Sequence, residues 1–395
     1  MPNYPSIVIH QKKIDAIKRF HPWIFSGALK TQPDDLPDGA VVEAYSQAGE
    51  YLATGFYTTG SIAIKILSFE KVHDVRTLIV ERIQQAYALR ERLGFTQEGS
   101  TNCYRLVNSE GDQLPGLIID WYNGTAVLQA HALGIYQLRD AIIDGLQQVY
   151  GSDLKAVYDK SAATLGKKAR TEVQNEYLYG AKTEGIVLEN DHRFLVDWET
   201  GQKTGFFLDQ RENRKLLGHF AADKKVLNAF CYSGGFSVYA IAANAKVVHS
   251  VDSSTRAIEG LETNLQLNPA TDTQHITYAE DVFTFLKDCD SDYDVIVLDP
   301  PAFAKSLSAR HQAMQAYRRL NLQAFSKLKK GGILFTFSCS QVVGTEHFTG
   351  AVTAGAIDAG RETRVLYHLD QPADHPTSIY HPEGRYLKGL VLAVN

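Results

Sequence analysis

The stretch KVLNAFCYSGGFS, residues 225–237, decides the fold of the second half of the chain. Its first six residues are mostly apolar, which predicts a buried strand over 225–230. The pair Gly234-Gly235 is typical of a turn at the start of a helix, where a backbone without Cβ can approach a ligand. The stretch lacks the GxGxxG pattern, so a purely structural role for the two glycines stays open.

The same strand-then-helix pattern continues towards the end of the chain. Further apolar strands are expected at 246–252, 275–281, 293–300 and 332–340. Helices are expected at 234–244, 254–268, 307–330 and 344–358. Near-continuous apolar strands separated by helices predict a parallel sheet covered on both faces, and therefore an α/β domain over 206–395.

The first half of the chain has a different pattern. Short β-branched and aromatic runs at 40–46, 51–58 and 62–69 predict a β-rich module over 1–75. Helical spacing at 75–93 and 134–150, with strands at 104–110, 116–122, 125–131 and 156–161, predicts an α+β domain over 76–185. Residues 186–205 look like a hairpin linker, so we expect a multidomain chain.

The composition excludes several classes of protein. The chain has 395 residues, 44% hydrophobic and 22% charged, with four cysteines, and these fractions exclude disordered, collagen-like and disulfide-scaffold proteins. No apolar run approaches the ~20 residues of a membrane span, and no secretory signal is visible, so we expect a cytoplasmic protein without a membrane partner. The scattered cysteines argue against a metal site.

Acidic residues follow the second and third predicted strands, where ligands bind in open α/β sheets. Asp252 lies 17 residues after Gly235, a distance at which a carboxylate can accept hydrogen bonds from ribose hydroxyls. Asp281 follows the next strand and is placed to accept from an adenine amino group. Both residues are also good helix N-caps, which is the structural alternative. Together with the glycine loop they predict a nucleoside-cofactor pocket.

The fourth and fifth strands end in the residues that carry most chemistry. Asp299-Pro300-Pro301 forms a stiff loop, because two prolines fix φ and remove two backbone donors. Cys339 follows the fifth strand at the same rim. Cys231 is expected to line the cofactor pocket, whereas Cys103 and Cys289 are expected to be small buried apolar residues.

At these residues the chain resembles a class I S-adenosylmethionine-dependent methyltransferase. More closely, it resembles the bacterial 23S ribosomal RNA (cytosine-C5) methyltransferase family over essentially its whole length. That family joins an N-terminal PUA-like barrel to a central α+β domain and a C-terminal Rossmann-like methyltransferase domain. The matching motifs are HPWIFSGAL (21–29), QKTGFFLDQRENR (202–214), NAFCYSGGFSV (228–238), LDPPAFAKS (298–306) and FSCS (337–340).

The resemblance implies S-adenosyl-L-methionine as the cofactor and a role for each residue of the site. It implies that Asp252 holds the ribose, that Asp281 holds the adenine and that Cys339 is the nucleophile. The Pro-Pro loop has no cysteine here, so the mechanism must use Cys339 alone. The other implied cofactor contacts are Asp209, Gln210, Arg211, Asn228, Phe230, Tyr232, Ser233, Gly234, Gly235 and Asp299.

The chemistry of cytosine agrees with these implied roles. A thiolate that adds to carbon 6 makes carbon 5 enamine-like, so that it can attack a sulfonium methyl. Asp299 is expected to hold the ring nitrogen and the amine of the base. The base must be flipped out or unpaired to react, with Pro300 and Pro301 beside it and Phe303 as its stacking partner.

Ribosomal RNA is the expected partner, although the net charge of −5 excludes a non-specific polycation. RNA binding must therefore depend on local basic clusters and on stacking. The candidate clusters are Lys12, Lys13, Lys18 and Arg19 beside Phe20, Trp23 and Phe25; Lys167, Lys168 and Arg170; and Arg310, Arg318 and Arg319. A solvated surface is the alternative for each, and a homodimer is a further option.

Two other functions stay open at this point. The residues are also compatible with a methyltransferase that acts on carbon 5 of uracil, which also needs a cysteine, or on a guanine nitrogen, which does not. The chain is also compatible with an RNA-binding assembly factor that has lost its activity. A dehydrogenase is excluded, because the GxGxxG loop is missing.

Overall fold

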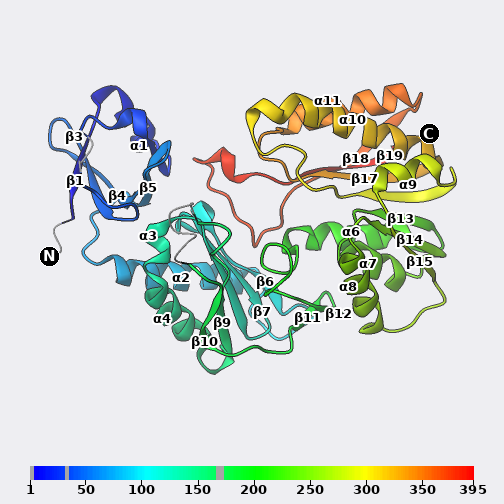
Figure 1. Cartoon of the computed structure of the whole chain (residues 1–395), viewed down its shortest axis with the longest axis horizontal. Coiled ribbons are helices and arrows are strands. Elements are labelled where there is room, and N and C mark those ends of the chain that lie inside the picture. Colours follow the sequence, from blue (N-terminus) through cyan, green and yellow to red (C-terminus); the bar gives the residue numbers. More distant parts are fainter. Residues whose placement is uncertain (1–3, 32–34, 166–172) are drawn as a thin grey trace. The chain divides into compact units, whose positions relative to one another are not determined.

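The structure is a computed structural model that describes residues 4–31, 35–165 and 173–395 (Figure 1). It divides into two compact units. Unit 1 comprises Met1–Val187, Val196–Leu208 and Ala373–Gly384, and unit 2 comprises Leu188–Leu195, Asp209–Pro372 and Arg385–Asn395. Among the described residues, none of the helices is both long and apolar enough to cross a membrane.

The first sheet of unit 1 has five strands in the order β1-β3-β4-β5-β2. Their bounds are β1 Ser6–Ile9, β2 Trp23–Phe25, β3 Val41–Ser46, β4 Tyr51–Tyr57 and β5 Ile62–Ser68, with the short helix α1 at Ile14–Lys18. Alternate residues such as Ile7, Val42 and Ile64 point into one buried core. The three strands predicted in residues 40–69 are confirmed, while β1 and β2 were not predicted.

The second sheet of unit 1 has the order β10-β9-β8-β7-β6 and is covered by helices. The strands are β6 Cys103–Asn108, β7 Leu117–Tyr122, β8 Thr125–Ala130, β9 Ala156–Asp159 and β10 Glu176–Gly180. The helices are α2 Val75–Arg92, α3 Leu133–Tyr136 and α4 Arg139–Tyr150. Ile83 of α2 and Ile142 of α4 share one core with Ile119 and Leu128 of the sheet, and β11 Ile186–Glu189 pairs separately with β12 His192–Leu195.

The sheet of unit 2 has seven strands in the order β15-β14-β13-β16-β17-β19-β18. The strands are β13 Lys225–Ala229, β14 Val247–Asp252, β15 Gln274–Ala279, β16 Tyr293–Leu298, β17 Leu328–Ser338, β18 Thr363–Leu369 and β19 Lys388–Val394. The first five run parallel to one another. The expectation of an entirely parallel sheet is wrong at one edge, because β19 runs antiparallel to both β17 and β18.

Helices cover both faces of this sheet, as predicted. They are α6 Arg211–Ala221, α7 Gly235–Ala242, α8 Thr255–Gln266, α9 Val282–Asp288, α10 Arg310–Lys327 and α11 Thr345–Asp358. Val226 packs with residues of α6 and α7, whereas its neighbour Leu227 packs with residues of α9, α10 and α11. Figure 1 shows these two groups of helices on opposite sides of the sheet. Both faces are therefore buried, which explains the continuous apolar runs.

One segment lies in a unit that its place in the sequence does not suggest. Residues Ala373–Gly384 connect β18 to β19 of unit 2, yet they are part of unit 1. The Asp374 carboxylate accepts a hydrogen bond from the Arg105 backbone at 3.0 Å, and the Asp374 carbonyl accepts one from the buried Arg90 at 2.7 Å. The domain boundaries expected at 75, 185 and 205 stay predictions.

Candidate functional site

The loop after β13 has an uncommon backbone conformation. Phe230 and Tyr232 have φ of 60° and 46°, in the left-handed region that side chains with Cβ seldom occupy. Hydrogen bonds hold the loop in this form: the Cys231 amide donates to the Val251 carbonyl at 3.0 Å, and the Gly234 amide to the Cys231 carbonyl at 2.8 Å. Strain of this kind is concentrated at ligand sites, which makes the loop a candidate.

The two glycines at the start of α7 have packing reasons for their identity. Gly234 has φ of 80°, and a Cβ there would lie 2.5 Å from Cγ of Leu261. A Cβ on Gly235 would lie 2.9 Å from Cδ of Arg214. The structural role that the sequence left open is therefore real at both positions, and it does not exclude a ligand beside the loop.

Asp252 is bound to the loop after β13. Its carboxylate accepts from the Tyr232 amide at 3.0 Å and from the Ser254 amide at 2.9 Å. Ser254, rather than Asp252, is the N-cap of α8. Asp252 therefore joins the ends of β13 and β14 at one point, where a ligand would contact both.

Asp281 has the structural role that the sequence offered as an alternative. It is the N-cap of α9, and its side chain accepts from the Thr284 amide at 3.0 Å. The capping carboxylate of Asp281 can still accept a second hydrogen bond, so this geometry leaves the predicted adenine contact as a prediction.

Ser233, which precedes the glycine pair, accepts a hydrogen bond through its carbonyl from the Asn264 side chain at 2.8 Å.

A network of polar side chains joins the start of α6 to the end of β16. The Gln210 amide donates to Oδ1 of Asp299 at 2.9 Å, and its oxygen accepts from Asn213 at 2.6 Å. Asp209 accepts from the Tyr386 hydroxyl at 2.6 Å. Burial, and then the nearby Asp209 carboxylate, raise the pKa of Asp299 to about 7. Arg211, also predicted at this site, is buried at the start of α6.

Two polar atoms of this region are buried and lack a hydrogen-bond partner among the described residues. They are Oδ1 of Asp209 and Oδ1 of Asn228. The Asn228 amide nitrogen, by contrast, donates to Ser237 at 2.8 Å. Buried acceptors without a donor are unfavourable unless a ligand or water supplies one, so both atoms point to a bound group with N–H or O–H donors.

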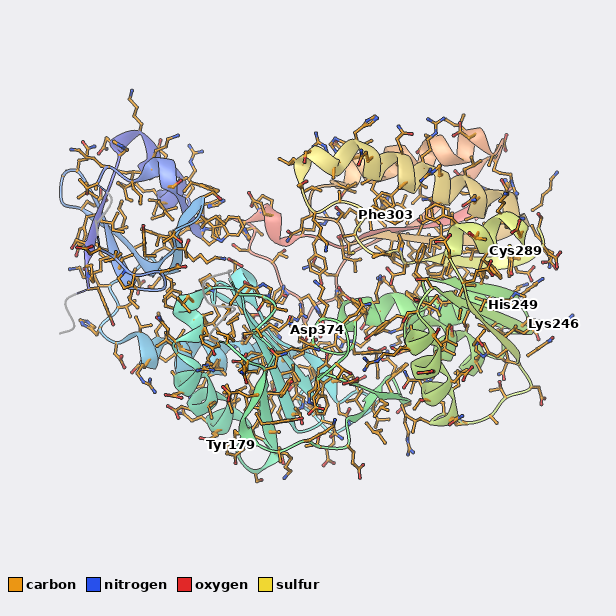
Figure 2. All side chains as sticks on the ribbon, viewed as in Figure 1. Tyr179, Lys246, His249, Cys289, Phe303 and Asp374 are labelled. Atoms are coloured by element: carbon orange, nitrogen blue, oxygen red, sulfur yellow. The ribbon has the colours of Figure 1, made fainter. Side chains whose placement is uncertain are left out.

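The loop after β16 carries Pro300, Pro301 and Phe303, as predicted. Pro300 is buried, Pro301 is exposed and Phe303 is half-buried. The ring of Phe303, labelled in Figure 2, lies 4.7 Å from that of Tyr317 and 6.4 Å from that of Phe283. The loop thus has an aromatic side that would suit a planar base.

Cys339 lies directly after β17, next to the loop of Phe303. The Ser340 hydroxyl donates to the Ala304 carbonyl at 2.7 Å, which joins the two loops. On the other side of Cys339, the Ser338 hydroxyl donates to the Tyr317 hydroxyl at 2.8 Å. Cys339 is half-buried, in contrast to the buried Cys103 and Cys231.

The other three cysteines are poor candidates for a nucleophile. None of the four cysteines forms a disulfide. Cys103 is fully buried in unit 1. Burial, together with the Asp252 carboxylate, raises the pKa of Cys231, and burial also raises that of Cys289. Since the thiolate is the reactive form, Cys339 is the best placed of the four.

The basic clusters differ in how much of their charge is available. Arg318 forms a two-bonded ion pair with Asp358 at 2.6 and 2.8 Å, and Lys18 pairs with Glu50 at 2.9 Å. The Arg319 guanidinium lies 5.6 Å from the ring of Phe283. The cluster of Lys167, Lys168 and Arg170 lies outside the described residues.

Three neighbours of the site were not predicted from the sequence. They are Asn213, Tyr317 and Tyr386, which hold Gln210, Ser338 and Asp209 respectively. Asn213 is in α6, a helix that was not expected, Tyr317 is in a helix that was expected only to cover the sheet, and Tyr386 precedes a strand that was not expected. Among the described residues, no group of His, Cys, Asp or Glu is arranged to hold a metal ion.

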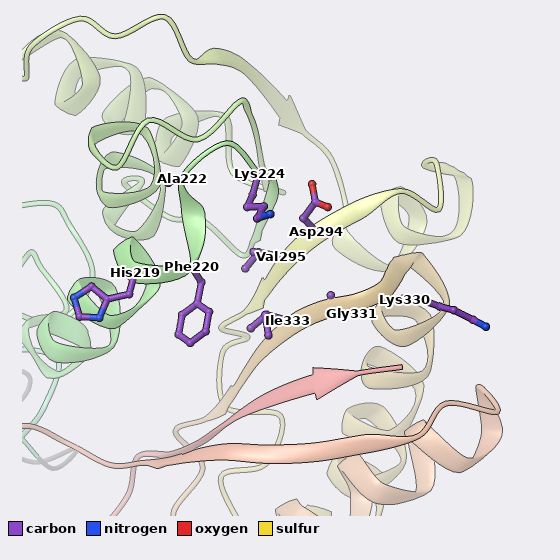
Figure 3. A pocket seen from close by; sticks show the side chains of 10 residues that line it. His219, Phe220, Ala222, Lys224, Asp294, Val295, Lys330, Gly331 and Ile333 are labelled. Atoms are coloured by element: carbon purple, nitrogen blue, oxygen red, sulfur yellow. The ribbon is translucent and has the colours of Figure 1, made fainter.

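A hollow of about 350 Å³ lies at the other end of the parallel strands, near the amino ends of β13 and β16 (Figure 3). Its lining includes Lys224 and Asp294, at the starts of β13 and β16, and His219 of α6. None of the predicted site residues lines it. The polar and strained groups described above gather instead at the carboxyl ends of the parallel strands, where such sheets bind ligands.

Comparisons with known proteins show which family the chain belongs to. A family model described as S-adenosylmethionine-dependent methyltransferase matches residues 105–378, and a PUA-like domain model matches residues 7–69. The ribosomal RNA large subunit methyltransferase I of Tolumonas auensis is 38% identical over 395 residues, covering 98% of each chain. The protein of the same name from Aeromonas hydrophila is 37% identical over 397 residues, again covering 98% of each.

Solved structures give the same result. A methyltransferase crystallised with SAH aligns with a TM-score of 0.83 at 25% identity, covering 98% of this chain and 100% of that one. A SAM-dependent methyltransferase from Streptococcus mutans aligns with a TM-score of 0.82 at 25% identity, with the same coverage. The unpartnered acceptors of Asn228 and Asp209 fit a cofactor that carries an ammonium group and hydroxyls. The chain therefore belongs to the S-adenosylmethionine-dependent methyltransferases, in the family of the proteins named ribosomal RNA large subunit methyltransferase I.

Proposed function

We propose that this enzyme methylates carbon 5 of a cytosine in the RNA of the large ribosomal subunit, with Cys339 as the nucleophile. The observation that carries the proposal is the bond between the Ser340 hydroxyl and the Ala304 carbonyl, at 2.7 Å. It holds the loop of the only well-placed cysteine against the Asp299-Pro300-Pro301 loop. The names of the relatives supply the class of RNA.

S-adenosylmethionine supplies an electrophilic methyl group when it is bound. We assign its ribose to Asp252 and its adenine to Asp281. Its methionine part we assign to the strained loop and to the acceptors of Asn228 and Asp209. The remaining assigned contacts are Gln210, Arg211, Phe230, Tyr232, Ser233, Gly234, Gly235 and Asp299.

The Cys339 thiolate attacks carbon 6 of the cytosine and forms a sulfur–carbon bond. The displaced electron pair makes carbon 5 a nucleophile, which the free base is not. Once carbon 5 carries the methyl group, loss of its proton to a base restores the double bond between carbons 5 and 6. The same step expels the thiolate, and the proton that the ring nitrogen received from Asp299 returns to that residue, so the enzyme returns to its starting state. S-adenosylhomocysteine is left as the second product.

Asp299 assists the attack by holding a proton near the ring nitrogen. With a pKa of about 7, a substantial fraction of this carboxyl is protonated at neutral pH. A protonated Asp299 can donate to the ring nitrogen that gains electron density when the thiolate adds. Gln210 holds one carboxyl oxygen at 2.9 Å and so orients the group.

The target base must leave its stack to reach Cys339. Phe303 offers a half-buried ring on which the extruded cytosine stacks, and Pro300 and Pro301 keep the loop beneath it stiff. Since the substrate is ribosomal RNA, we place the enzyme in the cytoplasm. The PUA-like part supplies further RNA contacts, and the homodimer considered above stays a prediction.

The test is to incubate ribosomal RNA from a strain lacking this gene with the enzyme and methyl-labelled cofactor. We expect label in 5-methylcytosine of the large-subunit RNA, identified by mass spectrometry of nucleosides. Cys339→Ala should lower kcat by about 10³-fold or more, as expected when a nucleophile is removed. Cys289→Ala, away from the site, serves as the matched control. Label in a guanine, or full activity of Cys339→Ala, would overturn the proposal.

A further inference from the structure

Lys388 is a buried lysine beside the loop that carries Cys339. It is the first residue of β19, it is 5% exposed, and its Cα lies opposite that of Ser338, the residue before Cys339. Its ammonium group donates to the Ser340 carbonyl at 2.6 Å and to the Val343 carbonyl at 2.7 Å. Lys388 therefore contacts the chain on both sides of the cysteine.

Among the residues that the structure describes, no carboxylate forms an ion pair with Lys388. Its two hydrogen-bond partners are carbonyls, and the nearby Asp370 is bound by Arg385 at 2.7 Å. An ammonium group in such a place acts strongly on its neighbours, because the surroundings screen charge poorly. Carrying a lysine into the interior is costly, so its retention in an otherwise apolar strand requires a reason.

We propose that Lys388 is a positioning residue for Cys339: its ammonium group anchors the loop, and its charge stabilises the thiolate. This inference rests on the proposed function, in which Cys339 attacks as a thiolate. A positive group near a thiol favours the ionised form. A lysine suits both tasks, since one compact ammonium can donate to two carbonyls and still present its charge.

The other titratable groups around Cys339 do not supply this charge. Tyr317 of α10 faces the sulfur, and burial raises its pKa to about 12, so it is neutral at physiological pH. Asp299 at the end of β16 interacts with Tyr317 and is neutral or negative. Arg385, which precedes β19, is paired with Asp370. Lys305 follows Ala304 on the neighbouring loop, but it is exposed, so that water screens its charge. Of these described cations, Lys388 is thus the buried one that forms no ion pair with a carboxylate.

Cys339 and Lys388 influence each other in the expected direction. Burial lowers the pKa of Lys388 to about 8, and the charge of Cys339 is the first of the opposing influences. At pH 7 most Lys388 side chains are then still protonated. Above about pH 8 the lysine becomes neutral and its support of the thiolate is lost.

The experiment is to measure the rate at which iodoacetamide alkylates Cys339 as a function of pH, in the full-length protein without RNA or cofactor. Mass spectrometry of the peptide that contains Cys339 separates it from the other cysteines. Lys388→Gln removes the charge but keeps amide donors for the carbonyls, whereas Lys388→Met removes both. We expect Lys388→Gln to raise the pH midpoint of Cys339 alkylation by one unit or more, which corresponds to about tenfold slower alkylation at pH 7.

Lys160→Met is the matched control, because Lys160 is also buried and donates to a carbonyl, that of Gly201, at 2.6 Å in unit 1. In the Lys160→Met variant, the pH midpoint of Cys339 alkylation should equal that of the wild type. Circular dichroism checks folding, and if Lys388→Met does not fold, Lys388→Gln still decides. An unchanged midpoint in a folded Lys388→Gln overturns the inference.

Activity measurements separate this inference from the proposed function. Lys388→Gln should lower kcat about tenfold at pH 7 and leave the KM for S-adenosylmethionine unchanged. If Cys339→Ala is inactive but the Lys388 variants keep the wild-type midpoint, the inference fails and the proposed function stands. If Cys339→Ala is fully active, the proposed function fails whatever the alkylation midpoints show.

Discussion

At the scale of single residues, the site depends on carboxylates that the fold treats differently. Asp252 accepts two backbone amides, and Asp281 caps a helix. Asp299 accepts from a neutral amide and lies near Asp209, so burial and repulsion raise its pKa to about 7. The three residues look alike in sequence, each at the end of a strand or just after it, but the surroundings that the fold gives Asp299 suit it to give up a proton near neutral pH.

Replacing Asp299 by Asn should therefore change stability in a pH-dependent way. The folded pKa lies above the ordinary value of 3.8, so the ionised group destabilises the fold fully above pH 7 and not at all below about pH 4. We expect Asp299→Asn to raise the free energy of unfolding by about 1–2 kcal/mol at pH 8, with no gain at pH 4. Thermal unfolding between pH 4 and 9 measures this, with the exposed Asp223→Asn as control. A stability difference between Asp299→Asn and the wild type that stays constant across that range would contradict the raised pKa of Asp299.

Removing the hydroxyl of Tyr386 should weaken the same network. Tyr386→Phe deletes the donor to Asp209 at 2.6 Å, and the other oxygen of that carboxylate is already buried without a partner. We expect a loss of about 1–3 kcal/mol in urea unfolding and weaker binding of S-adenosylmethionine in calorimetry. Tyr367→Phe, on an exposed side chain of β18, should change neither quantity.

At the scale of elements, strand ends and the loops after them assemble the site. The alternation of Val226 and Leu227 between two cores sets β13 in the middle of the sheet and directs its loop to the rim. That loop then needs left-handed conformations at Phe230, Tyr232 and Gly234. Only the last of these is visible from sequence, because glycine is the residue that tolerates such a φ without strain.

Replacing Gly234 or Gly218 of unit 2 by Ala should change the free energy of unfolding in opposite directions. Gly234→Ala puts a Cβ 2.5 Å from Leu261 at a φ of 80°, so we expect a loss of about 2 kcal/mol or more in unfolding free energy. Gly218→Ala lies inside α6 with nothing within 4 Å of its Cβ, so we expect a gain of up to about 1 kcal/mol. Chemical denaturation of both variants gives the comparison. A stable Gly234→Ala would show that the loop relaxes.

The helical and strand periods predicted most elements because they are local properties. The helix expected at 134–150 is nevertheless divided into α3 and α4, and Gly134 at the start of α3 lies so close to the ring of Phe56 that a Cβ there would collide with it. Likewise β18 has mostly exposed side chains and so lacks the apolar run of a buried strand, whereas the apolar run of β19 at residues 389–394 was overlooked. A pattern along the chain cannot show which distant partner covers a residue.

At the scale of the whole molecule, charge sets how the enzyme meets RNA. The net charge is −5, and some of the basic side chains, such as Arg318 and Lys18, are paired with carboxylates. Few phosphates can therefore be neutralised by the remaining cations.

We expect the affinity for RNA to depend only mildly on salt. The logarithm of the binding constant should fall with a slope of about −3 or shallower against the logarithm of salt concentration. Fluorescence anisotropy with a labelled fragment of large-subunit RNA, between 50 and 300 mM KCl, is the measurement. A slope of about −6 or steeper would mean that many more phosphates are contacted than these clusters provide.

The sequence by itself determined the order of the five strands in residues 225–340 but not the helix α9, and it identified the residues at the strand ends, including Asp252, Asp299 and Cys339. These follow from periodicity and from the rule that parallel sheets bind ligands at one edge. Only the tertiary structure decided that β19 brings Lys388 beside Cys339, and that residues 373–384 belong to unit 1. Both depend on pairings between segments far apart in the chain, and local side-chain patterns hold no record of such partners.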